Sequence, residues 1–185
     1  MTGPDFLCVG TDFPISDVLR ARVGLEADVV VVPIAAAFTG PTEAVIGISH
    51  QLPDQRVEGL IVTDRDGAAM EHFAQRVRTC DVVIIPDGSP LHLRTVLRGT
   101  PLLDALSTTR LIVTIGSVST VFGDPMIDPR GGAPTTGFGF FSDRVVTMEA
   151  PTLPRSIDLL GSSSPVSVIT SATGWERRGG IWSEI

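Results

Sequence analysis

The residues with the clearest chemical potential are two serines that follow a glycine at the end of an apolar run. Residues 111–115 are β-branched and apolar, which is typical of a central parallel strand, and Gly116 permits a sharp turn after them. Ser117 and Ser119 come next, in a stretch that can begin a helix. In α/β hydrolytic folds, a strand–turn–helix of this kind presents the nucleophile. Ser117 and Ser119 are therefore candidate nucleophiles, and capping of the following helix is the alternative role for them.

The partners that such a serine would need are scarce in this chain. The three histidines, His50, His72 and His92, all precede Ser117. The sequence contains no lysine, tyrosine or asparagine. Schiff-base lysines, serine–lysine dyads, tyrosine acids and asparagine oxyanion donors are therefore excluded.

Strand and helix patterns alternate along the chain up to these serines. Apolar runs predict strands at residues 6–10, 27–34, 57–63, 82–85 and 111–115. Helices are predicted at residues 15–23, 42–51, 68–78, 90–97 and 101–106, with Thr42 and Ser89 as N-caps. Apolar strands that alternate with helices indicate a mostly parallel sheet with helices on both faces. We predict a single three-layer α/β/α domain of flavodoxin-like type over residues 1–185.

The pattern changes after Gly123. Residues 124–141 are rich in glycine and proline and predict a long ordered loop. The remaining elements are predicted as strands at residues 144–148 and 166–170, a helix at residues 153–160, and a hairpin of two strands within residues 175–182.

The carboxyl ends of parallel strands are where such sheets bind their ligands. The loops that follow the predicted strands contain Asp12, Phe38, Asp87 with Gly88, and Gly116 with the two serines. We expect these residues to line one cleft, and we expect that cleft to be the largest hollow of the protein.

Composition limits the classes of partner. The chain has 185 residues and a net charge of −7, which argues against nucleic acid or an anionic membrane as a partner. Cys8 and Cys80 adjoin apolar runs and are expected to be buried, reduced thiols. The spacing of histidine and cysteine fits no metal site, so no metal or cofactor is expected. The sequence shows no signal-peptide pattern and no apolar run of about 18 residues, which leads us to expect a cytoplasmic protein.

Four stretches together resemble one family. They are residues 31–37 (VVPIAAA), 85–94 (IPDGSPLHLR), 124–133 (DPMIDPRGGA) and 136–141 (TGFGFF). With these motifs the chain resembles the cyanophycinase and aspartyl dipeptidase family of serine peptidases, within the class I glutamine amidotransferase-like superfamily. The resemblance implies acyl transfer by a serine–histidine–acid triad, with backbone amides that hold the oxyanion.

The chain departs from that pattern at each catalytic position. Alignment without gaps puts Gly116 in the nucleophile position, and Ser117 or Ser119 reaches it only with a shift. Glu149 stands where the family has its histidine, and Thr170 and Ser171 stand where it has an acidic pair. Asp87-Gly88 replaces a glycine pair, and a carboxylate there would repel a developing oxyanion by several kcal/mol at about 4 Å. A β-branched Val118 would be strained in so tight a turn.

Three functions follow from this comparison. The first is a homologue that has lost the triad and binds a small molecule or a protein without hydrolysis. The second is a divergent serine hydrolase or peptidase in which Ser117 or Ser119 reacts with Glu149 as its base. The third is a structural subunit that pairs with an active paralogue. A homodimer is compatible with each of them.

Overall fold

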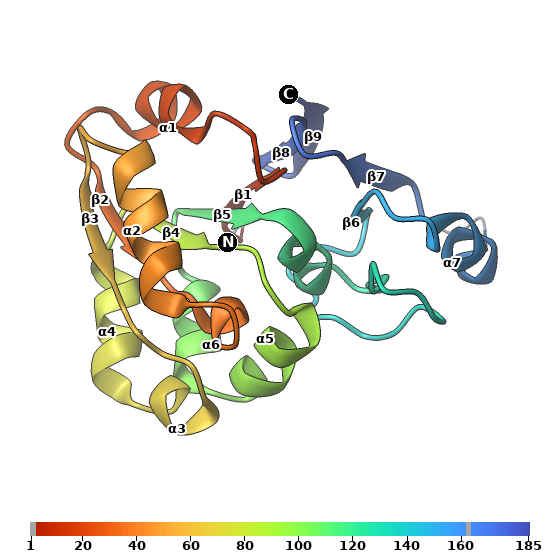
Figure 1. Cartoon of the computed structure of the whole chain (residues 1–185), viewed down its shortest axis with the longest axis horizontal. Coiled ribbons are helices and arrows are strands. Elements are labelled where there is room, and N and C mark those ends of the chain that lie inside the picture. Colours follow the sequence, from red (N-terminus) through yellow and green to blue (C-terminus); the bar gives the residue numbers. More distant parts are fainter. Residues whose placement is uncertain (1–2, 162–163) are drawn as a thin grey trace.

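A seven-stranded sheet forms the centre of the protein, in the order β3-β2-β4-β5-β1-β8-β9 (Figure 1). The computed structural model describes residues 3–161 and 164–185. The strands are β1 (Asp5–Val9), β2 (Asp28–Val31), β3 (Arg56–Gly59), β4 (Val82–Ile85), β5 (Leu111–Ile115), β8 (Gly174–Arg178) and β9 (Ile181–Glu184). Strands β1 to β5 pair in parallel, and β8 and β9 extend the sheet antiparallel beyond β1. The predicted, mostly parallel sheet is therefore confirmed.

Helices cover both faces of this sheet (Figure 1). They are α1 (Ile15–Val23) and α2 (Pro41–Gln51) on one face, and α3 (Arg65–Ala68), α4 (Glu71–Thr79), α5 (Pro90–Leu97) and α6 (Pro101–Leu106) on the other. Successive side chains of a strand point to opposite faces, so Leu7 and Val9 pack towards α1 and α2, whereas Phe6 and Cys8 pack towards α4 to α6. Burial on both faces explains why the parallel strands are continuous apolar runs.

The C-terminal third builds a smaller unit beside the sheet. Strands β6 (Val145–Met148) and β7 (Val166–Ile169) pair in parallel and pack on α7 (Leu153–Leu160). The predicted hairpin is present as β8 and β9. The Arg144 guanidinium lies 4.7 Å from the ring centroid of Trp175 on β8 and 5.8 Å from that of Trp182 on β9. Arg144 also donates a hydrogen bond of 2.7 Å to Ser167 Oγ, so it ties β7 to the hairpin.

Two helix starts differ from the sequence prediction. Thr42 does not cap α2: Gly40 is its N-cap, with φ of +118°, and Pro41 is the first helical residue. The helix predicted at residues 68–78 is two helices, because Asp64 caps the short α3 by accepting from the Gly67 amide at 2.8 Å. Local caps thus decided boundaries that the apolar periodicity alone placed elsewhere.

The predicted cap of α5 is confirmed and permits a clean stability test. The His92 amide donates to Ser89 Oγ at 3.3 Å, and Pro90 occupies the first helical position. We expect Ser89→Ala to lower the free energy of unfolding by about 1 kcal/mol, the usual effect of removing a serine cap. Urea denaturation measures it, with exposed Ser142→Ala as the control that should change stability by less than about 0.5 kcal/mol. An equal effect of the two substitutions would show that the cap contributes nothing.

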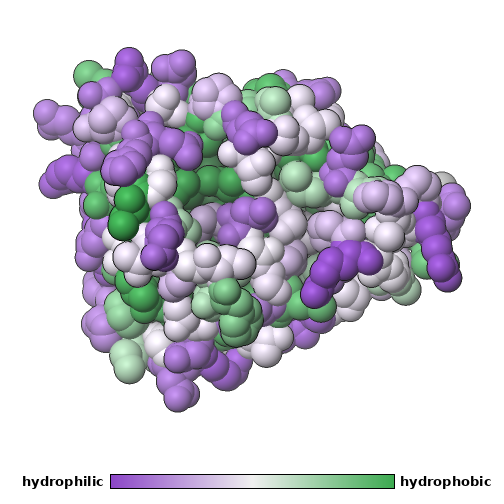
Figure 2. Space-filling view, in the orientation of Figure 1, coloured by the Kyte–Doolittle hydropathy of each residue, from purple (hydrophilic) through white to green (hydrophobic). Residues whose placement is uncertain are grey.

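The surface seen in Figure 2 is hydrophilic around its rim, with separate hydrophobic patches inside it. Among the helices of the described residues, none has the length and apolar character needed to cross a lipid bilayer.

Candidate functional site

The order of the strands creates a crevice between β2 and β4. The chain passes from β2 outward to β3 and then returns to β4, on the other side of β2. The segment after β2 leads to α2 on one face of the sheet, and the segment after β4 leads to α5 on the opposite face. At such a reversal the two connections lead to helices on opposite faces and leave a crevice at the carboxyl ends of the strands, which is where parallel α/β sheets bind ligands.

A hollow of about 340 Å³ lies in this crevice. Its lining comes from the segments after β2, β4 and β5 and from the long loop: Ala35, Phe38, Thr39, Gly88, Ser89, Pro90, Ser117, Asp128, Pro129 and Arg130. Of the residues that we expected in the cleft, Phe38, Gly88 and Ser117 are therefore in it, whereas Asp12, Asp87, Gly116 and Ser119 are not among its lining residues. We refer to this hollow as the switch-point cleft.

Gly88 lets the two loops of the cleft meet. A Cβ at this position would lie 2.1 Å from the carbonyl oxygen of Ala35, far closer than real Cβ contacts. The neighbouring Ser89 amide donates a hydrogen bond of 2.9 Å to that same oxygen. Only glycine permits this approach of one backbone to the other, so Gly88 has a structural reason to be glycine.

Phe38 is the exposed apolar wall of the cleft. Its side chain is 78% exposed, and its ring centroid lies 4.7 Å from that of His92 in an edge contact. The His92 Nε2–H donates a hydrogen bond of 2.8 Å to the carbonyl oxygen of Thr63. His92 therefore packs against Phe38, and its Nε2 is hydrogen-bonded to a backbone carbonyl oxygen rather than to a serine.

The turn after β5 has the predicted form. β5 lies between β4 and β1, and Gly116 follows it with φ of +69°, a backbone conformation that favours glycine. A 3₁₀ helix then runs over Gly116–Phe122. Val118 lies in this 3₁₀ helix without left-handed backbone strain, because no residue other than glycine has a positive φ in the described chain.

The Asp87 carboxylate occupies the space beside this turn. Its Oδ1 accepts hydrogen bonds from the Ser117 amide at 2.9 Å and from Ser117 Oγ at 2.8 Å. Ser117 Oγ also lies 2.9 Å from the carbonyl oxygen of Gly88. A Cβ on Gly116 would lie 2.5 Å from Cγ and from Oδ1 of Asp87, so the carboxylate fills the place of a side chain at position 116. The expectation that Ser117 caps the helix is wrong, because its hydroxyl bonds to Asp87 and Gly88 instead.

Ser119 lies under the turn and not in the cleft, which corrects our prediction. It is fully buried, and its Oγ lies 2.8 Å from Thr114 Oγ1. Nearby Cys8 is buried as predicted: burial raises the pKa of its thiol to about 12, against the lesser, opposing effect of hydrogen bonds with Thr114 and Ser119. Ser119 is a buried polar residue of the core. Like Ser117, it does not cap the 3₁₀ helix.

Glu149 and Asp12 also lie outside the switch-point cleft. Glu149 is exposed at the end of β6, and among the described residues its carboxylate has no hydrogen bond to Ser117 or Ser119. Asp12 follows β1, where its amide donates to the carbonyl oxygen of Ser171 at 2.7 Å. The segment after β7 therefore lies against the end of β1. Thr170 bonds within that segment, with its Oγ1 2.9 Å from Thr173 Oγ1.

The long loop contributes a charged pair that we did not predict. The Arg130 Nη2 lies 2.8 Å from Asp128 Oδ2 at the rim of the cleft. Burial alone would raise the pKa of Asp128, but hydrogen bonds from Arg130 outweigh it and hold that pKa below its usual value. Thr120 positions the loop, because its hydroxyl donates to the Ile127 carbonyl at 2.6 Å and accepts from the Ile127 amide at 3.0 Å. The sequence Asp128-Pro129-Arg130 in a glycine-rich loop is the signal from which this charged pair could have been predicted.

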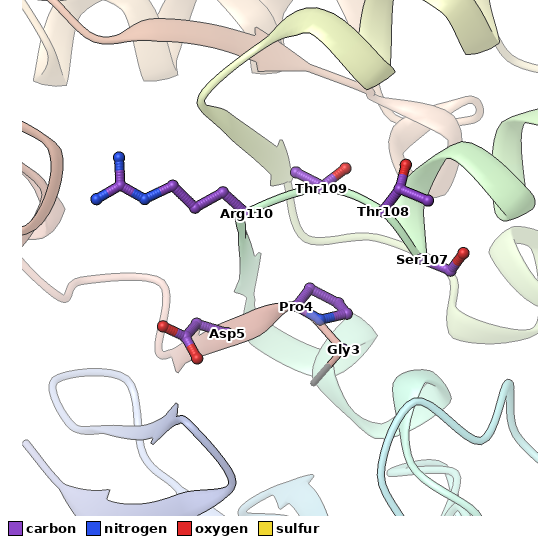
Figure 3. Close-up of a pocket in the computed structure, with 7 residues that line it drawn as sticks. All are labelled: Gly3, Pro4, Asp5, Ser107, Thr108, Thr109 and Arg110. Atoms are coloured by element: carbon purple, nitrogen blue, oxygen red, sulfur yellow. The ribbon is translucent and has the colours of Figure 1, made fainter. Parts of the chain in front are cut away.

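A larger hollow, of about 400 Å³, lies at the opposite edge of the sheet. It is lined by Gly3, Pro4, Asp5 and residues 107–110, at the amino ends of β1 and β5. Our expectation that the largest hollow would lie at the carboxyl ends is therefore wrong. Figure 3 shows that the side chains of Asp5 and Arg110 extend one way while those of Ser107 and Thr108 point elsewhere, so they do not converge on a common point. Nothing in this arrangement selects a ligand.

Metal ligation finds no support in the part of the chain that the structure describes, where no three histidine, cysteine, aspartate or glutamate side chains come together to hold an ion.

Comparison with known proteins identifies the fold. No protein-family model matches the chain, and no curated protein matches it. A solved peptidase from an acI-B1 Actinobacterium superimposes with a TM-score of 0.80 at 15% identity, over 99% of this chain and 87% of that one. A Listeria monocytogenes EGD-e protein with the provisional name peptidase E superimposes with a TM-score of 0.70 at 15% identity, over 99% of this chain and 98% of that one. At such identity the likeness establishes a common α/β fold with these peptidases.

Proposed function

We propose that this protein is a non-hydrolytic homologue of the cyanophycinase and aspartyl dipeptidase type, and that its switch-point cleft binds a small ligand with an apolar part. The observation that carries the proposal is the Asp87 carboxylate beside Gly116. It fills the place of a side chain at the turn and accepts the hydrogen bonds of Ser117.

The same contact works against acyl transfer. In nucleophile elbows, the amide of the residue after the nucleophile binds the oxyanion. Here the amide after Gly116 belongs to Ser117 and already donates to the Asp87 carboxylate at 2.9 Å. A second negative charge at that place would be repelled, although solvent screens part of the charge because Asp87 is exposed.

The lining of the cleft favours an apolar or aromatic ligand. Phe38 presents its ring to solvent, and Ala35, Pro90 and Pro129 add apolar surface. Exposed aromatic rings beside a hollow are typical of ligand contacts, because ring burial contributes more than that of smaller side chains. Ser117 and Arg130 supply the polar groups at the rim.

Binding of 1-anilinonaphthalene-8-sulfonate, a fluorescent aromatic anion, tests the cleft. We expect saturable fluorescence enhancement in the wild type, and about tenfold weaker binding in Phe38→Ala, because the ring contact is lost. Ile181→Ala is the matched control, since Ile181 on β9 is 76% exposed and lies outside the cleft. Equal dissociation constants for the wild type and Phe38→Ala would place the probe elsewhere and refute the proposed cleft.

A further inference from the structure

We propose that a cluster of three arginines, Arg65, Arg94 and Arg98, binds the phosphate group of a soluble ligand at a second site. The three side chains line a hollow of about 390 Å³ together with Thr95. They come from α3, from α5 and from the residue that follows α5. The site is separate from the switch-point cleft, whose lining contains none of these arginines.

The lining of this hollow combines three positive charges with no negative one. The protein has 14 basic side chains, all arginine, and a net charge of −7, yet three of the arginines converge on one hollow whose lining contains no acidic residue. Asp64 and Asp66 adjoin Arg65 in the sequence, but neither lines the hollow. Like charges gathered in this way raise the local potential and attract anions.

Neutral oxygens hold the three guanidinium groups in place. Arg65 Nη1 donates to the carbonyl oxygens of Thr95 at 3.3 Å and Arg98 at 2.8 Å. Arg94 Nη2 and Arg98 Nη2 donate to Thr136 Oγ1 at 2.8 and 3.3 Å, and Arg98 Nη2 also lies 3.2 Å from the Gly137 carbonyl oxygen. These bonds position the side chains, but no carboxylate of the described residues pairs with their positive charges.

Five of the other eleven arginines are paired. Arg20, Arg22, Arg76, Arg78 and Arg130 each form an ion pair with a carboxylate. Within the described residues, the three arginines of the cluster form no ion pair, and Arg94 Nε is buried without a hydrogen-bond partner. A buried donor of this kind is costly until something accepts from it.

Phosphate is the anion that this arrangement suits. A guanidinium group offers parallel N–H donors that match two phosphate oxygens, and a dianion can offset more than one positive charge. The carbonyl end of α5 carries the negative end of the helix dipole, which opposes anion binding by about 0.3–1 kcal/mol. Arg65 donates hydrogen bonds to two of those carbonyl oxygens, and its positive charge offsets the negative end of the dipole. The overall negative charge of the chain favours a soluble phosphate over an anionic bilayer.

The wild-type protein allows a test that needs no substitution. Phenylglyoxal modifies accessible arginines, and peptide mass spectrometry locates the modified residues. We expect inorganic phosphate to slow the modification of Arg65, Arg94 and Arg98 at least fivefold, and to leave exposed Arg155 on α7 unchanged. Equal protection of Arg155, or no protection of the cluster, would overturn the proposal.

Substitution gives a second, independent readout. We expect Arg94→Gln to weaken inorganic phosphate binding about tenfold, measured by calorimetry, because one charge-assisted bond is lost. Arg94→Lys keeps the positive charge but loses the paired N–H donors of the guanidinium, so its affinity for phosphate should lie between those of the wild type and Arg94→Gln. Arg155→Gln should bind phosphate like the wild type. Unchanged binding in Arg94→Gln would refute the site. Flotation with vesicles containing phosphatidic acid should show no binding, and binding that Arg94→Gln abolishes would overturn the assignment to a soluble ligand.

Discussion

Gly116→Ala is expected to lower the free energy of unfolding by about 2–6 kcal/mol. The backbone at Gly116 has φ of +69°, where a side chain costs about 1–3 kcal/mol. The added Cβ would also lie 2.5 Å from the Asp87 carboxyl carbon, and overpacking of this kind costs a further 1–3 kcal/mol or so. Urea denaturation of the purified variant, monitored by circular dichroism, measures the change.

The Asp87→Ala background separates the two causes. Truncation of Asp87 removes the three atoms nearest to a Cβ at position 116, so Gly116→Ala should then cost only the backbone strain. We expect the two substitutions to couple by about 1–2 kcal/mol in a double-mutant cycle. If their effects simply add, Asp87 does not occupy the space beside Gly116 and the central observation behind the proposed function is lost.

Turnover of aspartyl dipeptides and cyanophycin-like polymers is expected to be no faster with the wild type than with the Ser117→Ala, Ser119→Ala double variant. Acyl transfer needs a base for the serine proton, an acid for the leaving amine and donors for the oxyanion. Ser119 is fully buried, and the Ser117 hydroxyl bonds to Asp87 rather than to a histidine. Loss of triad function lowers turnover by a factor of about 10⁴ to 10⁶.

Single variants identify the source of any activity that appears. Ser119→Ala changes only a buried contact with Thr114 and serves as the control for altered packing. Ser117→Ala removes the half-buried hydroxyl that faces the cleft. Hydrolysis by the wild type and by Ser119→Ala, but not by Ser117→Ala, would contradict the non-hydrolytic proposal. It would make the Ser117–Asp87 pair the centre of a divergent hydrolase.

Local patterns in the sequence determined the elements and their alternation. The β-branched run at Leu111–Ile115 is a buried central strand, because a strand covered on both faces needs apolar side chains at every position. Gly116 is the turn after it, because a positive φ favours glycine. Ser89 and Pro90 begin α5, since their chemistry satisfies a helix start without help from the rest of the chain. These features depend on residues close in sequence, so the sequence alone was sufficient to predict them.

The tertiary structure decided which of these elements meet. Asp87 and Ser117 are 30 positions apart, and they bond only because β4 and β5 are neighbours in the sheet. Strand order likewise put the reversal between β2 and β4, which brings Phe38 beside the loop of Gly88 and leaves Asp12 outside. Ser119 lies two residues from Ser117 but is buried, because the 3₁₀ helix turns its side chain towards Thr114. Contacts between distant segments depend on strand order and on the direction of each side chain, and local sequence preferences contain neither.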